Sequence, residues 1–198
     1  LHLSIRRQRQ MCIRDRGGSA EFLWVKLKQE KPEILGCISL PCGVVSITEK
    51  YGFPEIGPEG YKRIVKDTRA LLDPFDKEFE ISQTLSNGNA QILGTAGTIT
   101  TISAIQMGLK KYTRNLVDGS WLKISDVNLI CKNLVLATFD QRAAYTCIGR
   151  GRAELIVAGC AVLEAICKMW SSHKLRVADR GLKEGILVEL SDIVLHPN

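Results

Sequence analysis

Residues 90–98, Ala-Gln-Ile-Leu-Gly-Thr-Ala-Gly-Thr, decide the fold that we predict for this 198-residue chain. The short apolar run 90–93 is typical of a buried strand, and it leads directly into a turn rich in glycine and threonine. Isoleucines then recur at the spacing of one helix face, at positions 99, 102 and 105. A strand, a glycine turn and a helix in this order predict the start of a parallel β-α-β crossover.

Three apolar runs upstream of this segment predict an antiparallel meander, because short connections join them. The predicted strands are residues 21–28, 34–40 and 44–48. The turn Gly17-Gly18-Ser19 precedes the first strand, and Pro41-Cys42-Gly43 separates the second from the third. A helix is expected over residues 58–72, with Pro74 just beyond its end.

The remainder of the chain continues this α/β pattern. Asp118-Gly119 predicts a turn. Further helices are expected over residues 125–138, 152–170 and 182–190, with a last strand over residues 175–177. The order of elements, β-β-β-α-β-α followed by helices, a strand and a helix, fits a ribonuclease-H-like plan. This step is an analogy at the level of fold, and a fold alone does not give a function.

Composition indicates a globular protein and excludes several other classes. Hydrophobic residues make up 45% of the chain and charged residues 24%, which is too apolar for a disordered segment. The longest apolar stretch, residues 155–167, contains Glu164 and is too short to span a membrane. The seven cysteines show no C-x-x-C spacing and only three histidines are present. We therefore expect no zinc site and a reducing, cytoplasmic location.

Residues 1–16 form a basic arm that carries five arginines and most of the net charge of +6. The arm has three interpretations: a nucleic-acid-binding arm, an arginine-rich targeting peptide, or a segment foreign to the natural protein. We favour the third, because residues 4–16 resemble translated sequencing-adapter sequence. We therefore expect this arm to have no regular structure and few contacts. Nucleic-acid binding is not expected, because no basic stripe alternates with aromatic residues.

Two turns combine glycine with hydroxyl side chains and are candidates for binding phosphate. The candidate residues are Gly17, Gly18 and Ser19 in the first turn, and Gly94, Thr95, Ala96, Gly97 and Thr98 in the second. Backbone N–H groups in such turns converge on an anion, and the start of a following helix adds a favourable dipole. Each turn alone is weak evidence, because most Gly-Gly-Ser segments are only turns. Their occurrence together predicts one phosphate cleft, with Ser19 across a groove from residues 95–98.

Six segments, in order along the chain, resemble the motifs of a known family. They are residues 17–21 (family pattern D-I-G-G-G-S-x-E), 39–45 (S-L-P-x-G-V-V), 94–101 (G-T-S-G-T-x-T-T), 117–119 (V-D-G), 152–159 (R-A-D-L-I-x-A-G) and 177–185 (V-S-D-x-G-L-R-E-G). The chain thereby resembles the Ppx/GppA phosphatase family of exopolyphosphatases and guanosine pentaphosphate phosphohydrolases, and alphaproteobacterial members most of all. The resemblance implies that residues 17–198 are the second subdomain of an actin/Hsp70/sugar-kinase (ASKHA) fold. Residues 1–16 are expected to be a non-native arm, on the adapter-like sequence described above.

The resemblance also implies a function and a cofactor. It implies a hydrolase that releases the terminal phosphate of inorganic polyphosphate or guanosine pentaphosphate, with no nucleic-acid or membrane partner. A homodimer is compatible with it. The implied cofactor is Mg²⁺, for which Glu21 is the expected carboxylate, directly or through water. The two turns would hold phosphate through backbone and hydroxyl donors.

The departures from the family pattern lie at the first turn. In register with Ser19, the motif aspartate falls at Arg14 and the first motif glycine at Arg16. The resemblance therefore implies that the first subdomain is missing, together with its phosphate loop and the glutamate that activates water. We expect no general base in this chain and little hydrolysis by it alone. The alternatives are a phosphate- or nucleotide-binding module without catalysis and a kinase of the same superfamily, although a kinase should show a substrate-recognition segment that is absent here.

Overall fold

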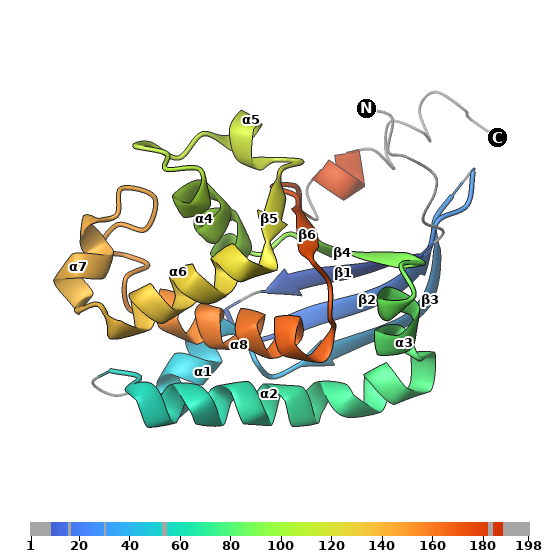
Figure 1. Ribbon diagram of the computed structural model, residues 1–198, viewed down its shortest axis with the longest axis horizontal. Helices are drawn as coiled ribbons and strands as arrows, with labels where there is room; N and C mark the ends of the chain where they lie inside the picture. Colours follow the sequence, from blue (N-terminus) through green and yellow to red (C-terminus); the bar gives the residue numbers. More distant parts are fainter. Residues whose placement is uncertain (1–8, 16, 30, 53–54, 182–183, 188–198) are drawn as a thin grey trace.

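A six-stranded sheet in the order β3-β2-β1-β4-β6-β5 forms the centre of the molecule (Figure 1). The computed structural model describes residues 9–15, 17–29, 31–52, 55–181 and 184–187. The strands are β1 (Arg9–Asp15), β2 (Ala20–Lys26), β3 (Glu33–Leu40), β4 (Ala90–Gly94), β5 (Trp121–Lys123) and β6 (Lys174–Val177). Strands β1, β2 and β3 pair antiparallel, whereas β4 pairs parallel with both β1 and β6. The expected combination of a meander with a parallel crossover is therefore confirmed.

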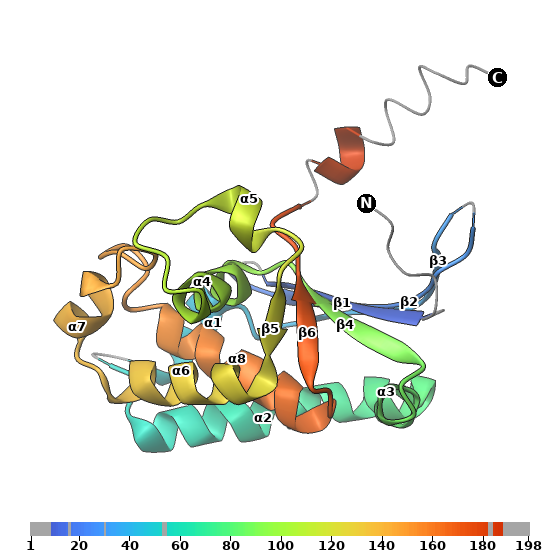
Figure 2. The same ribbon diagram turned by 45° about the horizontal axis from the view of Figure 1, so that its top comes forward.

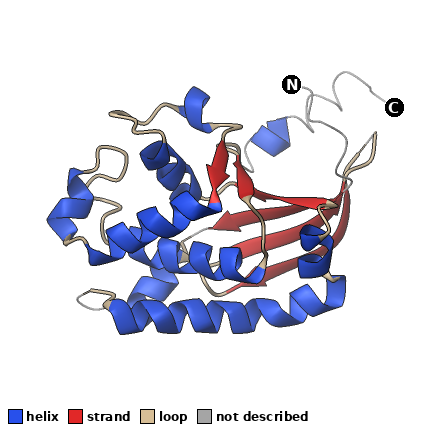
Figure 3. Cartoon of the chain, in the orientation of Figure 1, coloured by secondary structure: helices blue, strands red, loops and turns tan. Residues whose placement is uncertain are grey.

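Helices pack along one side of this sheet, which Figure 2 shows nearly edge-on and Figure 3 by secondary structure. They are α1 (Val44–Tyr51), α2 (Pro58–Phe79), α3 (Ile81–Ser86), α4 (Gly97–Gln106), α5 (Arg114–Val117), α6 (Ile124–Leu136), α7 (Phe139–Ala144) and α8 (Ile156–Met169). Ala20, Phe22 and Trp24 of β2 face this helical layer and are buried, whereas Glu21 and Leu23 alternate with them and are half-buried. Successive side chains of a strand point to opposite faces of the sheet, so this alternation shows that one face of β2 packs against the core. Among the described residues, no helix is long and apolar enough to cross a membrane.

The prediction that residues 1–16 lack regular structure is wrong for residues 9–15. These residues form β1, which pairs with β2 from Arg9↔Lys26 to Asp15↔Ala20 and with β4 on its other edge. Met11 is fully buried in the core. The physical reason is that the Gly17-Gly18 turn can reverse the chain, so that backbone groups of almost any preceding sequence complete the sheet. Residues 1–8 and Arg16 lie outside the described residues.

The predicted strand at residues 44–48 is also wrong, because this segment is the N-terminal part of α1. The β-branched pair Val44-Val45 favours a strand by propensity, but packing decides otherwise. The N–H groups of Val45 and Ser46 donate to the carbonyl of Gly17 at 2.8 and 3.2 Å, and Ile47 is buried in the core. The three-stranded meander therefore exists, with β1 in place of the strand predicted at residues 44–48.

Several helix boundaries differ from those expected. Helix α2 continues through Pro74, because Leu72 and Phe75 keep its apolar face buried on both sides of the proline. Helix α8 begins at Ile156 rather than at residue 152, since residues 150–155 form turns. The expected helix at 182–190 falls largely outside the described residues. The strand over residues 90–93, the helix carrying the isoleucines, the helix beginning near residue 125 and the last strand are confirmed.

Trp170 joins the helical layer to the sheet just beyond the end of α8. Its ring is fully buried and meets Phe22 of β2 edge-on, with 5.9 Å between ring centroids. Its indole N–H donates to Asp76 Oδ1 of α2 at 2.8 Å, and the same carboxylate accepts from the Ser82 N–H and hydroxyl. A buried indole that satisfies its donor in this way fixes the ends of α2 and α8 against β2.

We predict that Met11→Ala lowers the free energy of unfolding by about 2–5 kcal/mol, because it removes a fully buried side chain from β1. Met107→Ala is the matched control, since Met107 is 38% exposed, and it should change stability by about 0.5 kcal/mol or less. Urea denaturation followed by circular dichroism measures both variants. If both variants lose an equally small amount of the free energy of unfolding, β1 is not part of the cooperative fold.

Candidate phosphate-binding site

A cavity of about 180 Å³ lies where the two glycine turns meet. Strands β1 and β4 are parallel neighbours, so the turns that follow them leave the same edge of the sheet. The turn after β1 contributes Gly17, and the turn after β4 contributes Gly97 and Thr98. The remaining lining residues are Val44, Thr101, Arg152, Leu155 and Ile156. The predicted common cleft is therefore supported by geometry, although Ser19 itself does not line the cavity.

The first turn is tied to the N-terminus of α1. The Gly17 carbonyl accepts from the N–H groups of Val45 and Ser46, and the Ser46 hydroxyl donates to the Gly18 carbonyl at 3.1 Å. These hydrogen bonds place the first residue of α1, Val44, on the cavity wall. The positive end of the α1 dipole is thus directed at the cavity.

The second turn begins α4, whose N-terminal residue Gly97 lies on the cavity wall. A Cβ atom at Gly97 would meet nothing within 4 Å, so its backbone is open for the approach of a ligand. The Thr100 N–H and hydroxyl donate to the carbonyls of Ala96 and Gly97, both at 3.1 Å, and hold the first helical turn. Two helix N-termini and a hydroxyl side chain, Thr98, therefore converge on one small space, an arrangement that suits an anion.

Arg152 supplies the positive charge of this cavity. Its guanidinium Nη1 lies 3.4 Å from the Thr101 hydroxyl, at the hydrogen-bond limit. The turn that carries it is held by the buried side chain of Arg142, which donates to the carbonyls of Ala153 and Ala137 at 2.8 and 2.6 Å. None of the described lining residues is acidic. We did not predict Arg152 as a site residue, although the R-A-E-L-I segment that begins with it was a signal for it.

The other predicted phosphate residues have mainly structural surroundings. Gly94 is the last residue of β4, and its carbonyl accepts from the Ala178 N–H at 2.9 Å. A Cβ atom on Gly94 would lie 2.4 Å from the Ile99 side chain. Ala96 is buried beneath the turn, and Thr95 is half-buried. Of the eight predicted residues, Gly17, Gly97 and Thr98 reach the cavity wall.

Comparison with known proteins identifies the family. The Ppx/GppA phosphatase family model matches residues 4–193 of this chain. The chain belongs to the Ppx/GppA phosphatase family. Exopolyphosphatase 2 of Mycobacterium tuberculosis is 29% identical over 103 residues, which are 50% of this chain and 32% of that protein. A Haemophilus influenzae relative is 21% identical over 193 residues, covering 96% of this chain and 54% of its own length.

Solved structures confirm the fold of this Ppx/GppA chain. The Aquifex aeolicus member of the Ppx/GppA family superposes with a TM-score of 0.77 at 26% identity, over 96% of this chain and 58% of that one. An exopolyphosphatase from Cytophaga hutchinsonii superposes with a TM-score of 0.77 over 96% of this chain and 59% of its own, and at 23% identity it supports the fold alone. The expected half of an ASKHA-type fold is confirmed. The chain spans 58% and 59% of the length of these two solved relatives.

Glu21, the expected metal ligand, lies beside the first turn but outside the cavity lining. Its Oε1 atom accepts from the Ser19 hydroxyl at 2.6 Å, and its backbone pairs with Arg14 of β1 and Ser39 of β3. Within the described part of the chain, no group of three or more His, Cys, Asp or Glu residues could hold a metal by itself. Mg²⁺ is commonly held by one or two carboxylates together with substrate phosphates, and a single carboxylate at this position fits that mode.

Next to the cavity, a network of polar and charged side chains connects the turn before β5 to the segment that follows β6. Arg180 Nε and the Asp179 N–H donate to the Asp118 carboxylate at 2.8 and 2.9 Å. Burial alone would raise the pKa of Asp118, but these two donors hold it below its ordinary value. Burial, and donation to Asp179 Oδ2 at 2.8 Å, raise the pKa of the Tyr112 hydroxyl. The Asp118-Gly119 turn, with Gly119 at φ 77°, and residues 178–180 are thereby joined. The network fixes the segment that follows β6 beside the end of β4.

We predict that Gly159→Ala disturbs the second turn although Gly159 lies on α8. A Cβ atom there would lie 2.0 Å from the Thr98 hydroxyl oxygen and 2.8 Å from its methyl group, so Thr98 must move. Overpacking of this kind costs about 1–3 kcal/mol of stability, and it should also weaken pyrophosphate binding. Gly60→Ala is the control within α2, because its Cβ would meet only ordinary contacts at 3.6 Å.

Thermal denaturation and calorimetric titration with pyrophosphate measure this prediction. Unchanged stability and binding in Gly159→Ala would contradict the close packing of α8 on Thr98.

Proposed function

We propose that this chain carries the phosphate-binding part of a phosphoanhydride hydrolase that releases terminal phosphate from inorganic polyphosphate or guanosine pentaphosphate. The observation that carries the proposal is the cavity in which Gly17, Gly97, Thr98 and Arg152 meet. Its electrostatics favour an anion, and its volume of about 180 Å³ suits a terminal phosphate group. The Mycobacterium tuberculosis relative is an exopolyphosphatase, which supports polyphosphate as the substrate.

In this proposal each side of the cavity has a separate task. The N-terminus of α4 binds the phosphate oxygens through backbone N–H groups and holds the phosphoanhydride in one orientation. The N–H groups of Val45 and Ser46 in α1 are bound to Gly17, so α1 contributes the positive end of its dipole. The guanidinium of Arg152 neutralises charge that builds up on the equatorial oxygens during transfer. The Thr98 hydroxyl donates a further hydrogen bond. Because these donors are fixed by hydrogen bonds within the protein, little reorganisation accompanies the reaction.

Mg²⁺ is the proposed cofactor, held by Glu21, directly or through water, and by phosphate oxygens. When bound, the ion supplies charge neutralisation on the phosphates. The Ser19 hydroxyl orients the Glu21 carboxylate for this role through the hydrogen bond of 2.6 Å.

The second candidate function is a phosphate- or nucleotide-binding module without catalysis. It is favoured by one observation: the described cavity lining contains no carboxylate that could act as a general base. We propose that the base is a glutamate of another subdomain and that residues 17–198, together with β1 as their central strand, form the second ASKHA subdomain. Buried thiols at Cys131, Cys160 and Cys167 support a reducing, cytoplasmic location.

We predict that Arg152→Ala weakens pyrophosphate binding about 10–100-fold, the cost of about 1.5–3 kcal/mol for a lost charged hydrogen bond. Arg150→Ala removes the same charge two residues away, where Arg150 is 77% exposed and pairs with Asp140 outside the cavity, and should leave the affinity within about twofold. Isothermal titration calorimetry measures both dissociation constants. If the two variants bind pyrophosphate equally well, Arg152 is not part of the site.

The 198-residue chain should release phosphate from polyphosphate at least about 100-fold more slowly than the full-length Aquifex aeolicus family member. The reason is that general-base catalysis typically contributes about 10²–10⁴-fold, and no described residue of the cavity supplies it. A phosphate-release assay at equal protein concentration, with and without Mg²⁺, makes the comparison. Comparable turnover would place the general base within this chain and reject the binding-module interpretation.

A further inference from the structure

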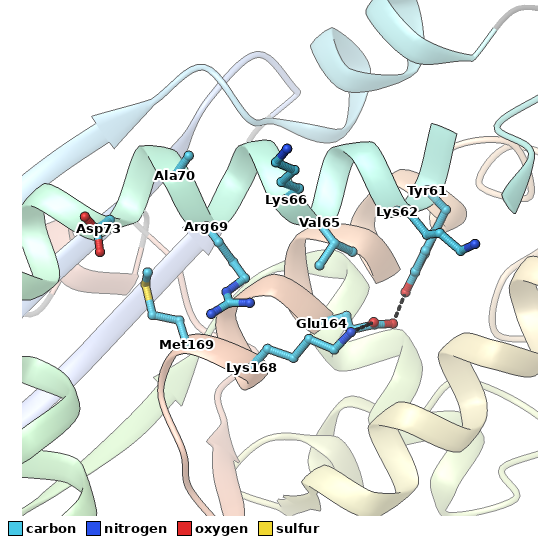
Figure 4. Close-up of a pocket in the computed structure, with 10 residues that line it drawn as sticks. All are labelled: Tyr61, Lys62, Val65, Lys66, Arg69, Ala70, Asp73, Glu164, Lys168 and Met169. Carbon is cyan, nitrogen blue, oxygen red and sulfur yellow. Dashed lines mark hydrogen bonds and ion pairs between the residues drawn. The ribbon is translucent and has the colours of Figure 1, made fainter. Parts of the chain in front are cut away.

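A second cationic hollow lies between α2 and α8, away from the glycine turns (Figure 4). It encloses about 490 Å³, and we call it the α2–α8 groove. Four cations line it: Lys62, Lys66 and Arg69 from α2, and Lys168 from α8. The acidic lining residues are Asp73 and Glu164, so the groove carries a formal charge of +2.

The three α2 cations stand on one helix face, because their spacings of four and three residues bring them to the same side. At 1.5 Å per residue they extend over about 10 Å along the groove. Figure 4 shows Arg69 reaching from α2 toward α8. Within the described residues, Lys66 and Arg69 take part in none of the ion pairs, whereas Asp73 pairs with Lys77 at 2.5 Å. The charges of Lys66 and Arg69 are therefore available to a ligand.

At the floor of the groove, Tyr61 and Lys168 both bind the carboxylate of Glu164. The Tyr61 hydroxyl donates to Glu164 Oε2 at 2.7 Å, and Lys168 Nζ lies 2.6 Å from Glu164 Oε1. Burial, with the nearby Cys131 thiol and Glu164, raises the pKa of the Tyr61 hydroxyl. Both Glu164 oxygens are thus occupied, and Lys62 pairs with Glu59 at 2.8 Å, so Lys66 and Arg69 are the lining cations that form no ion pair within the described residues.

The groove is separate from the glycine-turn cavity but shares a helix with it. Ile156 of α8 lines the cavity, and Glu164 lies eight residues further along the same helix, about 12 Å away. A bound monophosphate is too short to contact both places, whereas an extended chain of phosphates is long enough.

We propose that the α2–α8 groove is a second binding site, for the chain of inorganic polyphosphate at a distance from its reacting end. The polyphosphate class rests on the proposed function, but the groove shares no residue with the glycine-turn cavity. Binding at the groove raises the effective concentration of the polymer near the cavity, as a second contact on one ligand does. It adds affinity for long chains and none for pyrophosphate.

The groove favours inorganic polyphosphate over a single-stranded nucleic acid. Proteins that hold single strands combine a cationic groove with exposed aromatic rings on which bases stack. The aromatic residue of this groove, Tyr61, is 7% exposed and its hydroxyl is bound to Glu164. The lining therefore offers charge for phosphates without a surface for bases.

The test compares the double variant Lys66→Ala/Arg69→Ala with the control Lys28→Ala/Lys31→Ala. The control removes two exposed lysines from the β2–β3 connection, at another part of the surface. We expect the groove variant to bind long-chain polyphosphate about tenfold more weakly and to show a salt dependence shallower by about 1.4 in log–log slope. Circular dichroism should show both variants folded, because the substituted side chains are exposed.

Two further titrations separate this proposal from the proposed function. The groove variant should bind pyrophosphate as the unaltered chain does. Arg152→Ala should bind pyrophosphate about 10–100-fold more weakly and keep a Lys66- and Arg69-dependent affinity for long chains. Equal affinity of the groove and control variants for long-chain polyphosphate would overturn the second site. Competition by single-stranded DNA as strong as by polyphosphate would overturn the assignment of the ligand.

Discussion

The pairing of β1 on both of its edges is the constraint on which this fold depends. On one edge β1 meets the antiparallel pair β2 and β3, and on the other it meets β4, which leads to β6 and β5. Without β1, the antiparallel half and the parallel half of the sheet would have no common strand. The backbone N–H and C=O groups of β1 join the two halves by hydrogen bonds that do not depend on its side chains, and Met11 adds a buried side chain to the core.

The same pairing explains why two turns 80 residues apart share a cavity. Because β1 and β4 are parallel and adjacent, the chain leaves both strands at one edge of the sheet. The Gly17 carbonyl then fixes the start of α1, while β4 runs directly into α4. The convergence of two helix N-termini is therefore a consequence of strand order, and the turn containing Arg152 adds the charge that completes it.

Patterns local to a few residues predicted the structure well, and non-local packing accounts for the errors. The alternation in β2 was sufficient for a correct prediction because it reflects burial of one face. The isoleucine spacing also predicted α4 correctly, although residues 99–104 are buried on all sides of that helix. The pair Val44-Val45 gave a wrong strand prediction, because the helix that it begins depends on hydrogen bonds from the N–H groups of Val45 and Ser46 to Gly17, which lies 28 residues before Val45. Arg152 was missed as a site residue because its position depends on Arg142 and on a turn that periodicity does not reveal.

Trp170 gives the molecule a built-in optical probe. Its indole is fully buried between β2 and the ends of α2 and α8, with a carboxylate, Asp76, fixed at its N–H. Trp24 is also buried, whereas Trp121 is partly exposed and stacks with Lys174 and Arg176. Emission from Trp170 therefore responds to loosening of the contact between the helical layer and the sheet. Intrinsic fluorescence can follow the separation of α2 from α8, the two walls of the cationic groove, without any label.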